Sequence, residues 1–338
     1  MKKLALLATA LAMVSGSALA ADMPLKAVKA PPPPAFEPWD IAFGSAIMND
    51  YIFRGITQSN HKPSVTAYFE PRYNVTKDVQ LYVGTSFESI SFPNRAAAEV
   101  DVYGGGRVTL GAFAFDVGAW GYLYPGGTCH YGAPTDFAGV PLSAECQLNA
   151  LINGNVIKKD LSFFEVYGKV NYTFNDNFSM GGNVYYTPSF LNSGAPGTYA
   201  SVVGKAIAPS TWFGTSGIGM YVSGEFGRQW LGTSDAFYGT TTATAFGGPF
   251  PLGIPEPSYN TWNIGVGFTY KVFTLDLRYY DTNLSKGNCN AFTSDYSTTN
   301  FSPSFVTAIN PGGFGSNWCS ATGVVKFSAD LTAMTNLK

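Results

Sequence analysis

The sequence predicts an all-β protein, a transmembrane antiparallel up-and-down β-barrel of about twelve strands. Three observations lead to this fold class: an export signal at the N-terminus, many segments in which apolar and polar residues alternate, and links that are alternately long and short. Charged residues make up only 12% of the chain, yet no apolar run after the export signal is long enough for a spanning helix. A membrane barrel combines these properties because lipid-facing and lumen-facing residues alternate along each strand.

Residues 1–20 have the pattern of a secretory signal peptide. Lysines precede an apolar run, and Ala18-Leu19-Ala20 supplies the small residues of a cleavage site. A buried N-terminal helix is the alternative interpretation. Residues 21–38 contain four consecutive prolines and predict an extended periplasmic linker. We therefore expect export through the Sec pathway and a barrel over residues 39–338.

The strand predictions rest on a period of two residues. Between residues 99 and 109, for example, Glu99, Asp101 and Arg107 share one face, whereas a helix would scatter these charges. The same alternation recurs in segments long enough to cross a bilayer at a tilt. In order, the predicted strands are residues 39–47, 65–74, 79–88, 99–109, 113–124, 163–174, 178–187, 198–207, 217–230, 260–270, 273–281 and 323–331.

The lengths of the links distinguish a membrane barrel from a soluble β-sandwich. Short or middling links are expected at one end of the barrel and long ones at the other, as in short periplasmic turns and long extracellular loops. A sandwich has no reason to sort its links in this way, and an even strand number returns both termini to the periplasm. The short links are residues 75–78, 111–112, 175–177, 208–216 and 271–272, and the long ones are 48–62, 91–97, 125–162, 188–197, 231–259 and 282–322.

The two faces of the strands differ in polarity. The apolar face is predicted to contact outer-membrane lipid through Phe43, Phe69, Phe87, Phe115, Val166, Val184, Val222, Ile264, Val266, Leu277 and Phe327. The opposite face would line the lumen, and its charged members are Glu70, Arg72, Glu88, Glu99, Asp101, Arg107, Asp116, Glu165, Lys169, Lys205, Glu225, Asp276, Arg278, Lys326 and Asp330.

Two interpretations of this charged face stay open. The charges could line an aqueous path and set its ion preference, which would lean towards cations because acidic residues outnumber basic ones. They could instead form cross-strand ion pairs that fill a narrow barrel, since twelve strands lie between a filled eight-stranded barrel and an open sixteen-stranded one. Arg54, just past the first strand, could fold inward and narrow the pore mouth, or pair with a nearby carboxylate such as Asp50.

The cysteines fit an oxidising compartment. Cys129 and Cys146 fall in one long loop, and Cys289 and Cys319 fall in another. Pairing within each loop is the simplest of the three possible connectivities, and free thiols or pairing between the loops are the alternatives. Such bridges would restrain loops that have little core of their own.

A porin for small solutes or ions is the predicted function. A barrel hydrolase needs a histidine base beside its nucleophile, but His61 and His130 both fall in loops, so no enzymatic activity, metal or cofactor is expected. A net charge of −2 gives no basic surface for nucleic acid. A receptor or adhesin that uses the large loops is the alternative, and a homo-oligomer is compatible with either.

Three stretches of the sequence resemble the TorF-like putative porins, a family long catalogued as a conserved domain of unknown function. They are residues 50–59 (DYIFRGITQS), residues 164–167 (FEVY), and residues 280–285 (YDTNLS) with the following Cys289 and Trp318-Cys319. The resemblance extends over nearly all of residues 39–331. It implies a pore in the outer membrane of a Gram-negative bacterium, with an undefined substrate.

Overall fold

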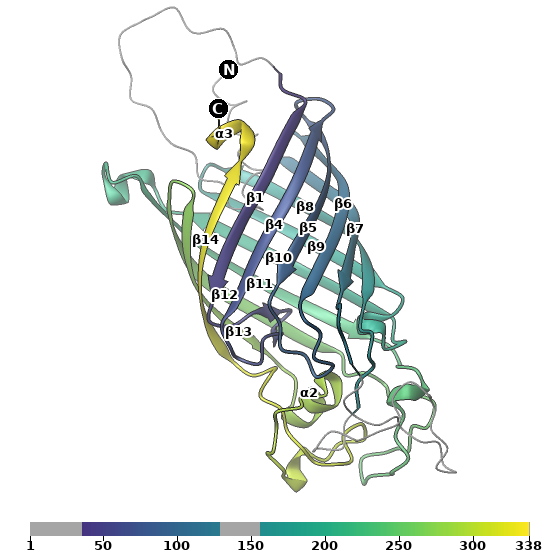
Figure 1. The fold of residues 1–338 in the computed structure, drawn as a ribbon. Coiled ribbons are helices and arrows are strands. Elements are labelled where there is room, and N and C mark those ends of the chain that lie inside the picture. Colours follow the sequence, from purple (N-terminus) through teal and green to yellow (C-terminus); the bar gives the residue numbers. More distant parts are fainter. Residues whose placement is uncertain (1–35, 129–155, 338) are drawn as a thin grey trace, which may run out of the picture.

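A computed structural model describes residues 36–128 and 156–337. Within them, twelve strands close into one antiparallel barrel, as predicted (Figure 1). Each predicted strand is present with both ends within one residue of the expected position. The strands are β1 (Trp39–Met48), β4 (Ser64–Asn74), β5 (Val79–Glu88), β6 (Glu99–Leu110), β7 (Phe113–Leu123), β8 (Phe163–Asn175), β9 (Phe178–Thr187), β10 (Gly197–Ile207), β11 (Ile218–Leu231), β12 (Tyr259–Tyr270), β13 (Phe273–Thr282) and β14 (Thr322–Thr332).

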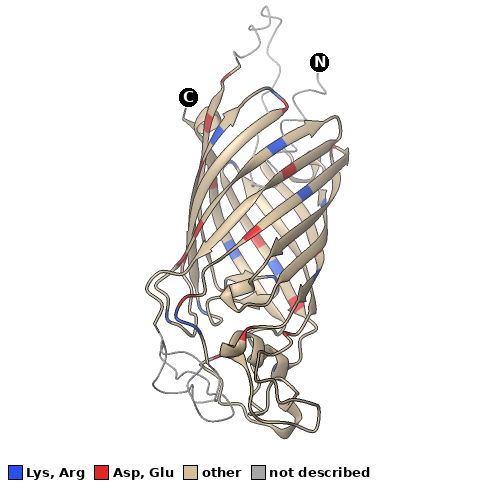
Figure 2. Cartoon of the chain, turned by 90° about the vertical axis from the view of Figure 1, so that its right-hand side faces the viewer, with Lys and Arg blue, Asp and Glu red and all other residues tan. Residues whose placement is uncertain are grey.

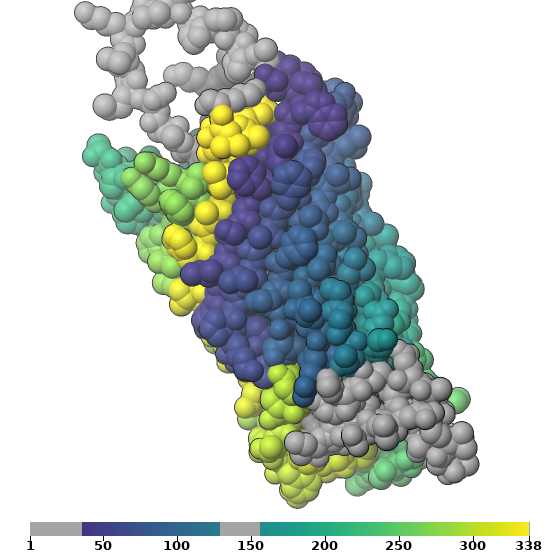
Figure 3. Space-filling view, viewed as in Figure 1, coloured from purple at the N-terminus to yellow at the C-terminus, as the bar shows by residue number. Residues whose placement is uncertain are grey.

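Every barrel strand pairs with the strands before and after it, and β1 pairs with β14 to close the ring. The closing register places Ala42 opposite Thr332 and Met48 opposite Lys326. Closure leaves no strand edge with unpaired backbone groups, as an environment without water requires. The space-filling view shows the wall formed by the N-terminal strands as a continuous surface (Figure 3).

The outward face of the barrel is apolar. Phe69, Phe87 and Val184 are each about half exposed, at 48%, 51% and 52% of their surface. Aromatic rings gather near the short-turn end, where Trp39 contacts Tyr73 and a chain of ring contacts links several neighbouring strands. An aromatic girdle of this kind marks a membrane interface. Its other ring contacts join Phe113, Phe115, Tyr172, Phe174 and Phe178, and Phe273 with Phe327.

The two ends of the barrel differ as the link lengths predict. Tight turns and both termini of the described chain lie at one end, which we call the short-turn end, and the long links lie at the other, the long-loop end (Figure 1). Short elements that the sequence did not reveal occur in the links and at the C-terminus. They are β2 (Ile52–Phe53), β3 (Ile56–Thr57), η2 (Phe190–Asn192), η3 (Ser210–Phe213), η4 (Ala236–Tyr238), α2 (Lys286–Thr293), η5 (Pro303–Phe305) and α3 (Ala333–Asn336).

The long loops pack against one another over the barrel mouth, so they form an apolar cap with a core of its own. One buried cluster contains Phe92, Ala96, Tyr122, Tyr124, Ile157, Leu161, Phe163 and Phe190. A second contains Ile56, Tyr259, Cys289, Trp318 and Cys319. Burial of apolar side chains at roughly 25 cal/mol per Å² supplies the cohesion of this cap.

A disulfide between Cys289 and Cys319 lies inside the second cluster, with Cα atoms 6.0 Å apart. The predicted pairing of these two cysteines is therefore confirmed. The other predicted pair, Cys129 and Cys146, lies outside the described residues, as do the signal peptide and most of the linker. Within the described ranges, no helix is both long and apolar enough to cross a membrane.

Candidate functional site

Charged residues of both signs lie along the barrel strands (Figure 2). On the wall of β4, β6 and β7, the Glu70 carboxylate accepts hydrogen bonds from Arg72 Nε at 2.6 Å and from Arg107 Nη1 at 2.8 Å. Arg107 also lies 3.4 Å from Asp116. These four predicted lumen residues are thus brought together as an ion-pair network, which agrees with the interpretation that lumen charges stiffen the wall.

Farther round the barrel the predicted lumen charges are sparser. Arg278 and Asp276 form an ion pair with a nitrogen–oxygen distance of 3.0 Å, and Lys326 lies opposite Asp276 in the strand register. The ammonium of Lys205 lies 4.3 Å from the centre of the Tyr221 ring. Asp330 accepts a hydrogen bond from the Tyr68 hydroxyl at 3.1 Å. The charged residues of this group come from three strands, β10, β13 and β14.

Tyrosines of the lumen face lie flat against the wall rather than across the lumen. Each ring covers a glycine of a neighbouring strand, and a β-carbon added at that glycine would clash with the ring. The glycines therefore provide the space into which the rings fold. The pairs are Tyr68 with Gly44, Tyr82 with Gly105, Tyr103 with Gly84, Tyr167 with Gly118, Tyr199 with Gly227, and Tyr221 with Gly267.

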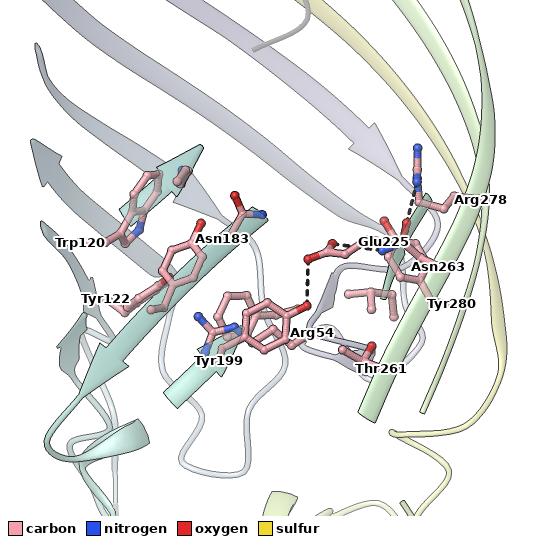
Figure 4. A pocket seen from close by; sticks show the side chains of 15 residues that line it. Arg54, Trp120, Tyr122, Asn183, Tyr199, Glu225, Thr261, Asn263, Arg278 and Tyr280 are labelled. Atoms are coloured by element: carbon pink, nitrogen blue, oxygen red, sulfur yellow. Dashed lines mark hydrogen bonds between the residues drawn. The ribbon is translucent and has the colours of Figure 1, made fainter. Parts of the chain in front are cut away.

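A cavity of about 470 Å³ lies in the lumen below the cap. Figure 4 shows Trp120, Tyr122 and Asn183 on one side of it, facing polar groups from β11, β12 and β13. Those groups form a chain: Glu225 accepts from Tyr199 at 2.9 Å and from Asn263 at 3.3 Å, and Asn263 accepts from Arg278 at 2.6 Å. Lys169 also lines the cavity, with its ammonium 4.5 Å from the centre of the Tyr167 ring.

The boundary of this cavity towards the long loops is a hairpin that enters the barrel. After β1 the chain forms the short strands β2 and β3, joined by Arg54 and Gly55, whose φ angles are +48° and +80°. Two successive positive φ angles are the mark of a two-residue type I′ hairpin turn, which favours glycine. A β-carbon on Gly55 would also clash with the side chains of Thr261 and Thr282. The hairpin tip is thus pressed against the inner wall.

Arg54 anchors the hairpin tip on the far side of the barrel. Its guanidinium donates to both oxygens of Glu165, at 2.9 and 2.6 Å, and to the side-chain oxygen of Gln229 at 2.8 Å. It also lies 4.4 Å from the ring centre of Tyr199 and 5.1 Å from that of Tyr185. In the strand order, β9 of Tyr185 is six strands from β1 in either direction. The hairpin therefore reaches across the lumen.

This arrangement corrects one expectation for Arg54. The guanidinium folds inward, but its partner is Glu165 and not Asp50, because Asp50 is already bound by Thr57, Ser59 and His61 of the same loop. Both members of the actual pair are buried, with side-chain exposures of 5% for Arg54 and 1% for Glu165. A bidentate pair of this kind combines charge with fixed geometry.

Burial also revises the roles expected of other residues. Glu88, Glu99 and Asp101 are only 9%, 2% and 4% exposed under the loops, so they do not face an open path in this structure. Conversely, the sequence reasoning missed the uncharged residues of the cavity, such as Asn183 and Asn263. Asn183 and Asn263 alternate with the outward-facing Val184 and Ile264, so the period of two residues assigns them to the lumen face, but they carry no charge.

His61 links the first long loop to the last. Its Nδ1 lies 2.7 Å from Asp50 Oδ2, and its Nε2 lies 3.2 Å from the carbonyl oxygen of Asn317. The hydrogen bond and negative charge of Asp50 outweigh partial burial and raise the pKa of His61 above 6.5. The nearby Ser59 hydroxyl donates to Asp50, so it is not paired with the imidazole as a nucleophile would be.

The raised pKa of His61 makes the contact between these loops depend on pH. A raised folded-state pKa means that the protonated His61 stabilises the contact between the loops. This stabilisation is complete below the unfolded-state pKa of about 6.5 and is lost as the pH rises through the folded-state pKa. We expect residues 50–62 to exchange amide hydrogens faster at about pH 8 than at about pH 5, relative to an H61Q variant at the same pH. Equal protection of wild type and variant at both pH values would contradict this.

Residues 34–148 match the model of a family described as a bacterial protein of unknown function, Gcw_chp. None of the curated proteins matches the chain. Among solved structures, the chain is similar to an outer membrane channel from Pseudomonas putida F1, at 10% identity over 90% of this chain and 100% of that one, with a TM-score of 0.39. It is also similar to LpxR from Salmonella typhimurium, at 8% identity over 86% of this chain and 99% of that one, with a TM-score of 0.38. The closed ring of strands and its apolar outer face, described above, give the chain the fold of an outer-membrane β-barrel.

Proposed function

We propose that this protein is a channel for small hydrophilic solutes or ions in the outer membrane of a Gram-negative bacterium, reached by Sec export. The observation that supports the proposal best is the polar cavity of about 470 Å³ inside the barrel. Its volume lies in the range of about 300–1,000 Å³ that suits small molecules. The tyrosines folded onto glycines keep the wall thin beside it, and the resemblance to TorF-like putative porins points to the same function.

The charge around the cavity bears on which solutes would pass. Lys169 and Arg278 face it together with Glu225. Basic side chains outnumber acidic ones among the residues that line the cavity, since Arg54 also faces it. The lean towards cations, expected from the number of acidic residues, therefore weakens. We propose a channel with little ion selectivity, in which neutral or zwitterionic solutes can bind polar groups of both signs.

The direct test is single-channel recording with the refolded mature protein in a planar bilayer at two salt concentrations. A water-filled path predicts discrete current steps that scale with salt, and a reversal potential near zero in a salt gradient. A silent bilayer, with correct folding shown by heat-modifiable mobility on a gel, would refute an open channel.

A receptor without transport is the second candidate, and the apolar cap over the barrel mouth favours it. The cap buries two hydrophobic clusters and contains the Cys289–Cys319 disulfide, so its described loops have a packed core of their own. Reduction of this disulfide separates the two functions. A gated channel should show altered current after reduction, whereas a receptor should stay silent and lose binding to its surface partner.

A further inference from the structure

Three carboxylates lie together at the long-loop end of the lumen wall, outside the cavity described above. Glu88 is the last residue of β5, and Glu99 and Asp101 lie at the start of β6, with Glu88 and Glu99 directly opposite each other in register. One oxygen atom from each side chain lies within 4.8 Å of the other two. Negative charges this close repel one another strongly in a buried setting unless something compensates for them.

Two oxygens of this cluster have no partner. The three side chains are at least nine-tenths buried, and Glu88 Oε2 and Asp101 Oδ1 form no hydrogen bond of normal geometry, although the indole N–H of Trp120 lies near the Asp101 carboxylate. The second oxygen of Glu88 accepts from Thr66 at 2.9 Å, and that of Asp101 accepts from Ser86 at 3.0 Å. A buried carboxylate oxygen without a donor costs free energy, which makes these two atoms ready ligands for a cation.

Basic side chains do not neutralise the cluster. Among the described residues, none of the ion pairs includes any of the three carboxylates. Lys326 attracts Glu88 from a distance without forming an ion pair with it. Glu99 instead accepts hydrogen bonds from the hydroxyls of Tyr51 and Tyr124, at 2.6 and 2.7 Å. These bonds orient Glu99 but add no positive charge.

We propose that Glu88, Glu99 and Asp101 bind a divalent cation of the size of Ca²⁺. Ca²⁺ takes oxygen ligands at about 2.3–2.6 Å, so ligands on opposite sides of it are about 4.6–5.2 Å apart. One oxygen atom of each carboxylate lies within 4.8 Å of the other two, so one ion of this size can contact all three, and Ca²⁺ tolerates irregular ligand geometry better than Mg²⁺ does. Sites on extracellular modules bind Ca²⁺ with dissociation constants on the order of 10⁻⁴–10⁻³ M, and we expect this range.

The position of the site gives the cation a structural role. Tyr51, which donates to Glu99, immediately precedes β2 and lies three residues before Arg54. A cation that fixes Glu99 would therefore hold the entry of the hairpin against β6. This proposal is independent of whether the barrel conducts, because it concerns only the cation and the loop that it restrains.

Terbium luminescence tests the site directly. Tb³⁺ occupies Ca²⁺ sites, and Tyr51 and Tyr124 lie close enough to Glu99 to sensitise its emission. We expect the wild-type protein in detergent to show saturable Tb³⁺ emission that Ca²⁺ displaces. Asp101→Asn and Glu88→Gln should each weaken Tb³⁺ binding at least about tenfold, since each removes a charged ligand while keeping the acceptor for Ser86 or Thr66. Asp330→Asn, which changes a lumen carboxylate on β14, should bind as the wild type does.

The unfolding temperature with and without Ca²⁺ provides a second measurement, which tests the site even if one variant folds poorly. Ca²⁺ should raise the unfolding temperature of the wild type and of D330N but not of D101N or E88Q, because a ligand stabilises only the state that binds it. In chelator, D101N and E88Q should be as stable as the wild type or more so, since each relieves repulsion. Absence of saturable emission in the wild type, unchanged binding in D101N and E88Q, or equal loss in D330N would each overturn the proposal.

Discussion

Replacing Arg54 with alanine should raise the single-channel conductance severalfold. The guanidinium spans the last part of the lumen to Glu165 and Gln229, and no other described contact ties the hairpin tip to that wall as firmly. Alanine removes both the bulk and the anchor, so the path beside the hairpin widens. Planar-bilayer recording of R54A and wild type under the same salt checks this.

The control for R54A is E225Q. Glu225 lines the same cavity and bonds to Tyr199 and Asn263, but it does not touch Arg54. Its replacement should change selectivity slightly and leave the size of the current step nearly unchanged. If R54A instead conducts as the wild type does while unfolding at a lower temperature, Arg54 is a structural anchor and the constriction lies elsewhere.

Replacing Glu165 with glutamine should release the hairpin from the wall. Removing one member of a buried ion pair leaves the other charge uncompensated and costs about 3–5 kcal/mol. The lost free energy destabilises the docked hairpin rather than the barrel strands, because the guanidinium of Arg54 becomes hydrated once the hairpin leaves the wall. We expect trypsin to cleave after Arg54 in E165Q but not in the wild type, and current through E165Q to fluctuate.

A double-mutant cycle distinguishes the contribution of the Arg54–Glu165 ion pair to docking from the contribution of the contacts that each residue makes separately. If the pair acts as a unit, R54Q/E165Q should lose less docking stability than the sum of the two single variants. Strictly additive losses would show that the guanidinium and the carboxylate are held by their separate neighbours. Resistance of E165Q to trypsin would place the anchor in the ring contacts of Tyr185 and Tyr199 instead.

The strands could be predicted from the sequence because their pattern is local. A period of two along ten or so residues specifies both the strand and its inward face, so it assigns Glu70 and Asp276 to the lumen face without reference to their partners. The loops obey no such period. The short hairpin turn had one local signal, a glycine after Arg54 between apolar residues, but it shows only that the chain reverses there.

The partners of Arg54 could not be predicted because they lie far away in the sequence. Glu165 and Gln229 are 111 and 175 residues from it, and only closure of the barrel brings them together. Asp50 was the nearer carboxylate, but three donors of its own loop already occupy it. Proximity along the chain favours a pair only when neither member has better partners.

The tyrosine and glycine pairs of the wall have a consequence for how the width of this lumen can change. In a wall without such pairs, a methyl group added to a glycine reduces the free volume of the lumen by the volume of that methyl group. Here a methyl group at Gly227 or Gly267 would leave no space for the phenol ring of Tyr199 or Tyr221, so the ring would swing away from the wall. A glycine-to-alanine substitution would thus move a whole aromatic ring into the lumen. The inner diameter of this barrel can therefore vary in large discrete steps while its strand number and register stay the same.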